Sequence, residues 1–277
     1  MVIPVVAAEN VWGNLVAQLG GNRTSVLSIV TDPNADPHEY EGSVTDASAI
    51  DHAQLVIVNG VGYDDWALQL LEAVPPPGPL VLNAGTLNGV VVGGGLVSGN
   101  PHLWYNPAYV YVTVAAMYTD LVKIDPADAS YFSQNFQTLN KSLDALYGGA
   151  AGIRAHFAGV AVAATEDLFV YLADFTGLNL VSPPDFMQAV GEGNDPPAQA
   201  VVTFQCQLES GGVRVLVYNQ QTITPITTEM RALAAQHHIL QVGATETIQP
   251  NGVAFQGWMG AEYHLLYVAL NSTGPAG

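Results

Sequence analysis

Short apolar runs alternate with longer segments of helical periodicity along most of the chain. Such runs, rich in Val, Ile and Leu, are typical of strands that are buried on both faces. Strands are predicted at 2–7, 26–29, 55–59, 80–83, 160–164, 213–218 and 239–242. Helices are predicted at 11–19, 43–52, 64–73, 166–176, 198–210, 225–236 and 256–270. This alternation predicts parallel sheets with helices on their faces.

The stretch 107–157 breaks the pattern because it carries no strand signal. A first helix is expected to end near Lys123, and Asp125-Pro126 then starts a second one as N-cap and first helical residue. Apolar positions at helical spacing extend the second helix over about 20–30 residues, with Gly148-Gly149 as a point of kink or interruption. We therefore predict an α/β fold of two lobes with mostly parallel sheets, 1–124 and 158–277, joined by a long helix at 125–157.

The net charge of the chain limits the kinds of molecule that it is expected to bind. The 277 residues include 24 Asp and Glu but only 6 Lys and Arg, which gives a formal net charge of −18. A chain this acidic is not expected to bind nucleic acid or anionic lipid surfaces, and cations are its natural partners. The single cysteine, Cys206, excludes an intrachain disulfide and a cysteine-based zinc site.

Candidate chemistry lies just after the predicted strands, because open parallel sheets bind ligands beyond the carboxyl ends of their strands. His38 and His102 lie in loops of the first half, and Glu166 and Glu246 follow strands of the second. All four could converge on one cleft. Two imidazoles and two carboxylates suit a divalent transition metal, whose charge the ionised carboxylates would balance. In the alternative reading, each Pro-His is a capped turn and each Thr-Glu begins a helix, where a carboxylate favours the helix dipole.

Several segments together resemble the zinc- and manganese-specific solute receptors of bacterial ABC importers. The resemblance runs in collinear order over nearly the whole chain. It rests on Ala8-Glu9-Asn10-Val11-Trp12, Asp36-Pro37-His38-Glu39-Tyr40-Glu41, Asn100-Pro101-His102-Leu103-Trp104-Tyr105, Ala163-Ala164-Thr165-Glu166, Tyr218-Asn219, Thr245-Glu246-Thr247 and Trp258-Met259.

The resemblance implies two lobes joined by a rigid long helix, with one metal ion between them. The family's four ligand positions fall on His38, His102, Glu166 and Glu246. A glutamate at the third position favours Mn²⁺ or Fe²⁺, although Zn²⁺ has the higher intrinsic affinity for the same donors. The implied role is capture of Mn²⁺, Zn²⁺ or Fe²⁺ outside the cytoplasmic membrane, in the periplasm or at the cell surface, and delivery to an ABC permease. A lipid anchor ahead of Met1, lost by truncation, is a further expectation.

The chain also departs from that family, whose helices display many lysines. The run 109–114 is apolar and β-branched, which makes a poor exposed helix. Either the protein is adapted to an acidic or unusual medium, or these faces are covered by a partner or by copies of the chain. The second reading gives an alternative function, a structural or assembly protein built on the same fold with a vestigial or purely structural metal site.

Enzymatic function is not predicted. The sequence has no G-x-S-x-G elbow, and Gly93-Gly94-Gly95 is not followed by the Lys-Ser/Thr of a phosphate loop. A metallohydrolase would need an open coordination position for water, which four protein ligands would close. The other five histidines, His52, His156, His237, His238 and His264, are interpreted as structural or solvent-facing.

Overall fold

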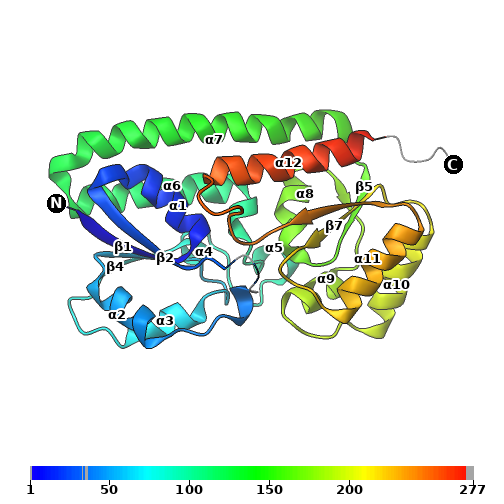
Figure 1. Ribbon diagram of the computed structural model, residues 1–277, viewed down its shortest axis with the longest axis horizontal. Coiled ribbons are helices and arrows are strands. Elements are labelled where there is room, and N and C mark those ends of the chain that lie inside the picture. The colour runs from blue at the N-terminus through cyan, green and yellow to red at the C-terminus, as the bar shows by residue number, and fades with distance from the viewer. Residues whose placement is uncertain (1, 33, 35–36, 273–277) are drawn as a thin grey trace. The chain divides into compact units, whose positions relative to one another are not determined.

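The computed structural model describes residues 2–32, 34 and 37–272 and contains two parallel β-sheets of four strands each (Figure 1). The chain divides into a first unit, Met1–Ala145 with Thr247–Gln256, and a second unit, Leu146–Glu246 with Gly257–Gly277. The predicted α/β fold with two parallel sheets is confirmed. No helix in the described part of the chain is both long and apolar enough to span a bilayer.

The sheet of the first unit has the order β2-β1-β3-β4. Its strands are β1 (Ile3–Glu9), β2 (Thr24–Val30), β3 (Leu55–Val58) and β4 (Leu80–Asn83). Helices α1 (Asn10–Gly20) and α6 (Pro107–Ile124) cover one face, and α2 (Val44–His52) and α3 (Asp65–Glu72) cover the other (Figure 1). Two covered faces explain why β1 and β3 are continuous apolar runs. Two single turns, α4 (Ala84–Leu87) and α5 (Gly95–Ser98), were not predicted.

Close packing of α1 on the sheet depends on Gly13. A Cβ atom at this position would lie 2.0 Å from Ser28 Oγ of β2 and 3.3 Å from Ala7 Cβ of β1. On the opposite face, Val6 and Val56 pack with Ile50 of α2 and Ala67 of α3 in a buried cluster. The first unit therefore has an apolar layer on each side of its sheet.

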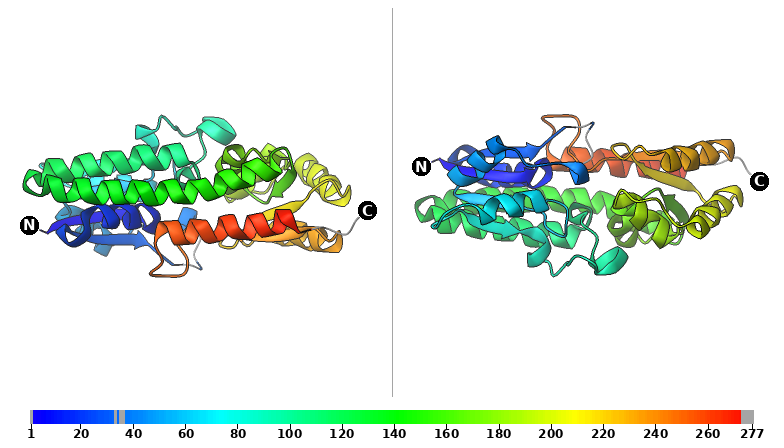
Figure 2. Two further views of the ribbon diagram at one scale, coloured as in Figure 1. Left: turned by 90° about the horizontal axis from the view of Figure 1, so that it is seen from above. Right: turned by 90° about the horizontal axis from the view of Figure 1, so that it is seen from below.

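The long helix α7 (Ala129–Phe157) continues through Gly148-Gly149 without a break, so the predicted interruption is wrong. Both glycines are exposed, whereas Leu146, Ala150 and Ile153 are buried at helical spacing. Burial of this stripe offsets the cost of about 1 kcal/mol that each glycine brings to a helix. Figure 2 shows α6 alongside the first half of α7, where Tyr118 stacks on Phe136 with ring centroids 4.8 Å apart.

The apolar run 109–114 lies within α6, where it forms a stripe that faces the core. Val110 and Val114 are fully buried, whereas Val112 is 44% exposed. Asn106 caps this helix by accepting the N–H of Ala108 at 3.0 Å, and Pro107 occupies its first position. The scarcity of charge in this stretch therefore follows from packing within the first unit, and self-association has no support.

The sheet of the second unit has the order β6-β5-β7-β8. Its strands are β5 (Ala161–Ala164), β6 (Asn179–Leu180), β7 (Val215–Asn219) and β8 (Leu240–Ala244). Its helices are α8 (Val170–Thr176), α9 (Pro184–Gly191), α10 (Ala198–Glu209), α11 (Pro225–Gln236) and the larger part of α12 (Phe255–Asn271). Neither β6 nor α9 was predicted; a strand of two residues such as β6 leaves no readable periodicity.

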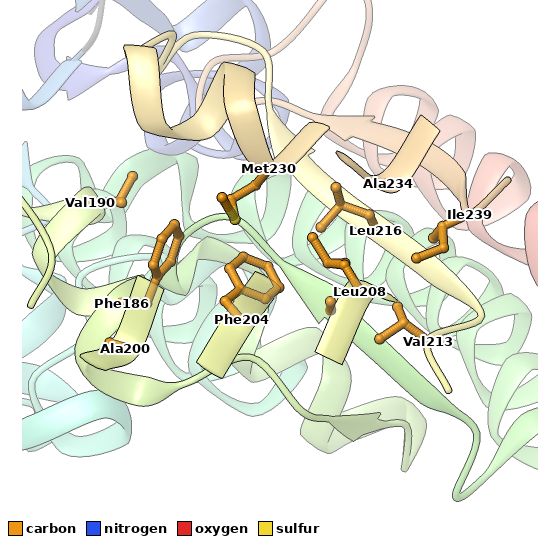
Figure 3. Close-up of a cluster of buried hydrophobic side chains, with 11 residues drawn as sticks. Phe186, Val190, Ala200, Phe204, Leu208, Val213, Leu216, Met230, Ala234 and Ile239 are labelled. Atoms are coloured by element: carbon orange, nitrogen blue, oxygen red, sulfur yellow. The ribbon is translucent and has the colours of Figure 1, made fainter. Parts of the chain in front are cut away.

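One core of the second unit lies where α9, α10 and α11 cover the sheet (Figure 3). Phe186 of α9 meets Phe204 of α10 edge to face, with ring centroids 4.8 Å apart, and Met230 of α11 points toward them. Leu216 of β7 supplies the strand side of the cluster. This packing fixes the sheet, and with it the carboxyl ends of β5, β7 and β8.

Candidate functional site

The two predicted histidines lie close together in the first unit. His38 lies in a 3₁₀ turn after β2, and His102 precedes the 3₁₀ turn Leu103–Tyr105. Their ring centroids are 5.5 Å apart at an interplanar angle of 67°. His102 is fully buried and His38 is partly buried. Asp36, which belongs to the same sequence motif as His38, lies outside the described residues.

The hydrogen bonds of Asn100 fix the tautomer of His102. Asn100 Oδ1 lies 2.9 Å from His102 Nδ1 and accepts the backbone N–H of His102, also at 2.9 Å. Because that N–H can only donate, the side-chain atom it meets is the oxygen of the amide. Nδ1 must therefore carry the proton and donate it, which leaves the lone pair on Nε2. This is the arrangement that a metal-ligating imidazole requires.

A chain of hydrogen bonds behind His102 fixes the backbone of its loop. Trp12 Nε1 of α1 donates to Asn59 Oδ1 at 3.0 Å, and Asn59 Nδ2 donates to the carbonyl oxygen of Pro101 at 2.8 Å. Tyr63 meets the His38 ring edge to face, with centroids 4.6 Å apart. The two histidines are thus positioned by residues of the first unit.

The two predicted glutamates come together in the second unit. Glu166 follows β5 in extended backbone, since the helix predicted to begin there starts as a 3₁₀ turn at Asp167. Glu246 follows β8. Asn219, the last residue of the intervening strand β7, donates from Nδ2 to Oε1 of Glu166 and to Oε1 of Glu246, both at 2.5 Å. Three neighbouring strands therefore end in two carboxylates and one shared donor.

The environment of these glutamates favours a cation. Glu166 and Glu246 are 1% and 0% exposed, and two buried carboxylates on one donor repel each other when both are ionised. Imidazole nitrogen and carboxylate oxygen together match borderline transition metals. The ligand types thus fit such an ion. The histidine pair belongs to the first unit and the glutamate pair to the second.

Asn219 is a polar residue of this cluster that sequence reasoning did not select. The dipeptide Tyr218-Asn219 is part of the resemblance, but a neutral amide is not among the side-chain types that usually bind transition metals. Its signal was positional, because it ends a strand at the edge where the glutamates were predicted to lie.

A second pair of acids, Glu9 and Asp64, lies buried in the first unit. Glu9 ends β1, and Asp64 accepts the N–H groups of Asn59 and Gly60 at 2.6 and 2.7 Å. Burial raises the pKa of Glu9 well above its usual range and that of Asp64 to about 6, so the pair holds a proton at pH values where exposed carboxyl groups are ionised. The nearby charge of Asp64 adds to the effect of burial on Glu9.

Two α/β units, one with a pair of histidines in its loops and one with a pair of glutamates at its strand ends, define the class of metal-binding solute receptors. The chain belongs to the family described as zinc-uptake complex component A, periplasmic (ZnuA), which residues 5–269 match. The predicted family is therefore confirmed. It is a family of zinc-uptake components, and relatives of this chain include substrate-binding lipoproteins of metal ABC transporters.

Individual relatives agree with this assignment. The chain is 27% identical over 133 residues to the iron-binding protein YfeA of Yersinia pestis, covering 47% of this chain and 42% of that protein. It is 27% identical over 146 residues to the manganese-binding lipoprotein MntA of Halalkalibacterium halodurans, covering 52% of this chain and 47% of that protein. The chain thus spans about half the length of these curated relatives.

The fold matches that of a solved receptor over almost its whole length. The periplasmic zinc-binding protein TroA of Treponema pallidum superimposes with a TM-score of 0.79 at 17% sequence identity. The match covers 98% of this chain and 100% of that one. The prediction of a two-lobed α/β receptor fold with a long helix is confirmed.

Proposed function

We propose that this protein is an extracytoplasmic receptor that captures one divalent transition-metal ion and delivers it to an ABC permease. His38, His102, Glu166 and Glu246 would be its ligands. In this proposal 1–124 and 158–277 act as the two lobes, and 125–157 links them. Neither pair of ligands would form a complete four-donor shell alone.

The observation that carries the proposal is the matched pair of half-sites. In the second unit two glutamates at strand ends share the donor Asn219, and in the first unit two histidines lie side by side, with His102 held by Asn100. Outer hydrogen bonds of this kind orient metal ligands and set their tautomers. Histidines and glutamates with only a packing role would not need this shared arrangement.

The proposed cargo is Zn²⁺, Mn²⁺ or Fe²⁺. Two imidazoles disfavour Mg²⁺ and Ca²⁺, which prefer oxygen ligands. The names of relatives include zinc, manganese and iron binders. The family description and the lipoproteins among the relatives support capture in the periplasm or at the cell surface. Four protein donors would leave no position for an activated water, so turnover is not proposed.

Paired histidine substitutions test the function. In calorimetric titrations with Zn²⁺ and Mn²⁺, the double variant His38→Ala/His102→Ala should lose high-affinity binding while its circular dichroism spectrum is unchanged. The matched control His237→Ala/His264→Ala removes two exposed imidazoles and should bind like the parent protein. Stoichiometric high-affinity binding by the first variant would contradict the proposal.

A further inference from the structure

The side-chain amide of Asn219 holds one oxygen of each proposed glutamate ligand. Its Nδ2 atom is 2.5 Å from Oε1 of Glu166 and 2.5 Å from Oε1 of Glu246. A primary amide carries two N–H protons, one for each carboxylate. Thr222 Oγ1 lies near the same nitrogen at the longer distance of 2.9 Å. All three side chains of the Glu166–Asn219–Glu246 cluster are buried.

The orientation of this amide is fixed from its other end. The backbone N–H of Gln221 donates to Asn219 Oδ1 at 2.9 Å, so the nitrogen must face the carboxylates. Gln221 Oε1 in turn accepts the backbone N–H of Glu246 at 2.7 Å. Asn219 and the backbone of Glu246 are thus tied into one hydrogen-bonded loop.

These hydrogen bonds restrict how each carboxylate can bind a metal. Charge-assisted bonds to a carboxylate are about twice as strong as neutral ones. An oxygen that accepts one is a weaker metal donor. Chelation through both oxygens would have to use Oε1, which already accepts a hydrogen bond from Asn219. The arrangement therefore favours one donor oxygen per glutamate.

On the basis of the proposed function, we propose that Asn219 is a specificity-determining positioning residue that limits Glu166 and Glu246 to one metal bond each. With two imidazoles this gives a shell of two nitrogens and two oxygens. Zn²⁺ is most often tetrahedral with four such donors, whereas Mn²⁺ favours octahedral shells rich in oxygen. Asn219 thereby shifts selectivity toward Zn²⁺, against the preference for Mn²⁺ or Fe²⁺ suggested by a glutamate at position 166.

Substitution of Asn219 tests the inference by selectivity rather than by affinity alone. Zn²⁺ and Mn²⁺ would be titrated in competition into the parent protein, Asn219→Ala and Asn219→Ser. Without the donor, the carboxylates can chelate. The ratio of Zn²⁺ to Mn²⁺ affinity should then fall by about tenfold or more, the scale on which outer hydrogen bonds alter metal binding. Gln207→Ala, which removes an amide donor to Val181 O elsewhere in the second unit, should leave the ratio unchanged.

Co²⁺ substitution gives a second readout, and its measurement on the parent protein needs no variant. The parent protein should give the intense visible absorption of four-coordinate Co²⁺, and Asn219→Ala the weak absorption of a higher coordination number. A weak six-coordinate spectrum of the parent protein would overturn the inference, even if the variants fail to fold. An equal loss of both metals in Asn219→Ala, with an unchanged ratio, would also overturn it by showing a merely structural role. Absence of any metal binding by the parent protein would instead overturn the proposed function.

Discussion

Asn100 accepts two hydrogen bonds from the same residue, His102, one from its backbone N–H and one from its ring Nδ1, both at 2.9 Å. The amide oxygen thereby fixes the ring orientation and places the imidazole lone pair on Nε2. Position 100 thus controls whether His102 is ready to bind a metal before any ion arrives.

Removal of the Asn100 side chain should weaken metal binding more than it weakens the fold. We expect Asn100→Ala to lower metal affinity by about 10–100-fold, because the His102 tautomer and orientation are no longer fixed. Asn100→Asp keeps an accepting oxygen and should retain most of the affinity. Competition titration against a chromophoric chelator would measure both variants, with exposed Asn22→Ala as control. Parent-like affinity in Asn100→Ala would contradict this role.

Metal affinity should fall steeply in acid, because a protonated imidazole has no lone pair to donate. We expect a loss of more than about tenfold between pH 7.5 and pH 5. His38→Ala removes one of the two competing protonations, so its weaker binding should depend less steeply on pH. Titrations at several pH values would show this, and equal slopes for both proteins would count against His38 as a ligand.

The buried Glu9–Asp64 pair should make stability depend on pH independently of any metal. Burial raises both pKa values in the folded state, that of Asp64 to about 6, so folding retains a proton that the unfolded chain releases near pH 4. This contribution is fully present below about pH 4 and is lost as pH rises through about 6 and beyond.

Glu9→Gln tests this dependence because an amide has the shape of the protonated acid but does not titrate. In the presence of chelator, its melting temperature should decline less between pH 5 and pH 8 than that of the parent protein. Exposed Glu72→Gln serves as the matched control and should follow the parent protein. Parallel curves for Glu9→Gln and the parent would exclude a proton held by Glu9.

The buried core in Figure 3 allows a prediction that concerns the stability of the fold and not metal binding. Phe204 is fully buried against Phe186, so Phe204→Ala should lower the free energy of unfolding by about 3–5 kcal/mol. Val202→Ala, on the exposed side of the same helix, should change it by less than about 0.5 kcal/mol. Urea denaturation of both variants would measure the difference, and a small effect of Phe204→Ala would show that the cluster can collapse around the lost ring.

Most of the fold could be predicted from the alternation of strand and helix patterns in the sequence. Strands covered on both faces are continuous apolar runs, such as Leu55–Val58. The sequence failed where local signals were weak or were overridden. The exposed Gly148-Gly149 pair does not break α7, because buried residues on its other side hold the helix. The two-residue strand β6 has no periodicity to detect.

For the candidate site, strand ends and residue types indicated which side chains to consider. The structure brings His38 close to His102 in one unit and Glu166 close to Glu246 in the other. The parts that sequence reasoning missed are neutral amides. Asn219 carries no charge and binds no metal itself, so its role is visible only through its contacts with the carboxylates.

Elemental analysis of the purified protein by plasma mass spectrometry, before and after chelator treatment, tests metal capture most directly. If the protein captures a metal ion, we expect one equivalent of Zn, Mn or Fe per chain. This metal should be lost with chelator and regained when the ion is added back. The double variant His38→Ala/His102→Ala should regain none. The proposed metal capture would be contradicted if the purified protein is metal-free, takes up none of these ions and shows no rise in melting temperature with any of them.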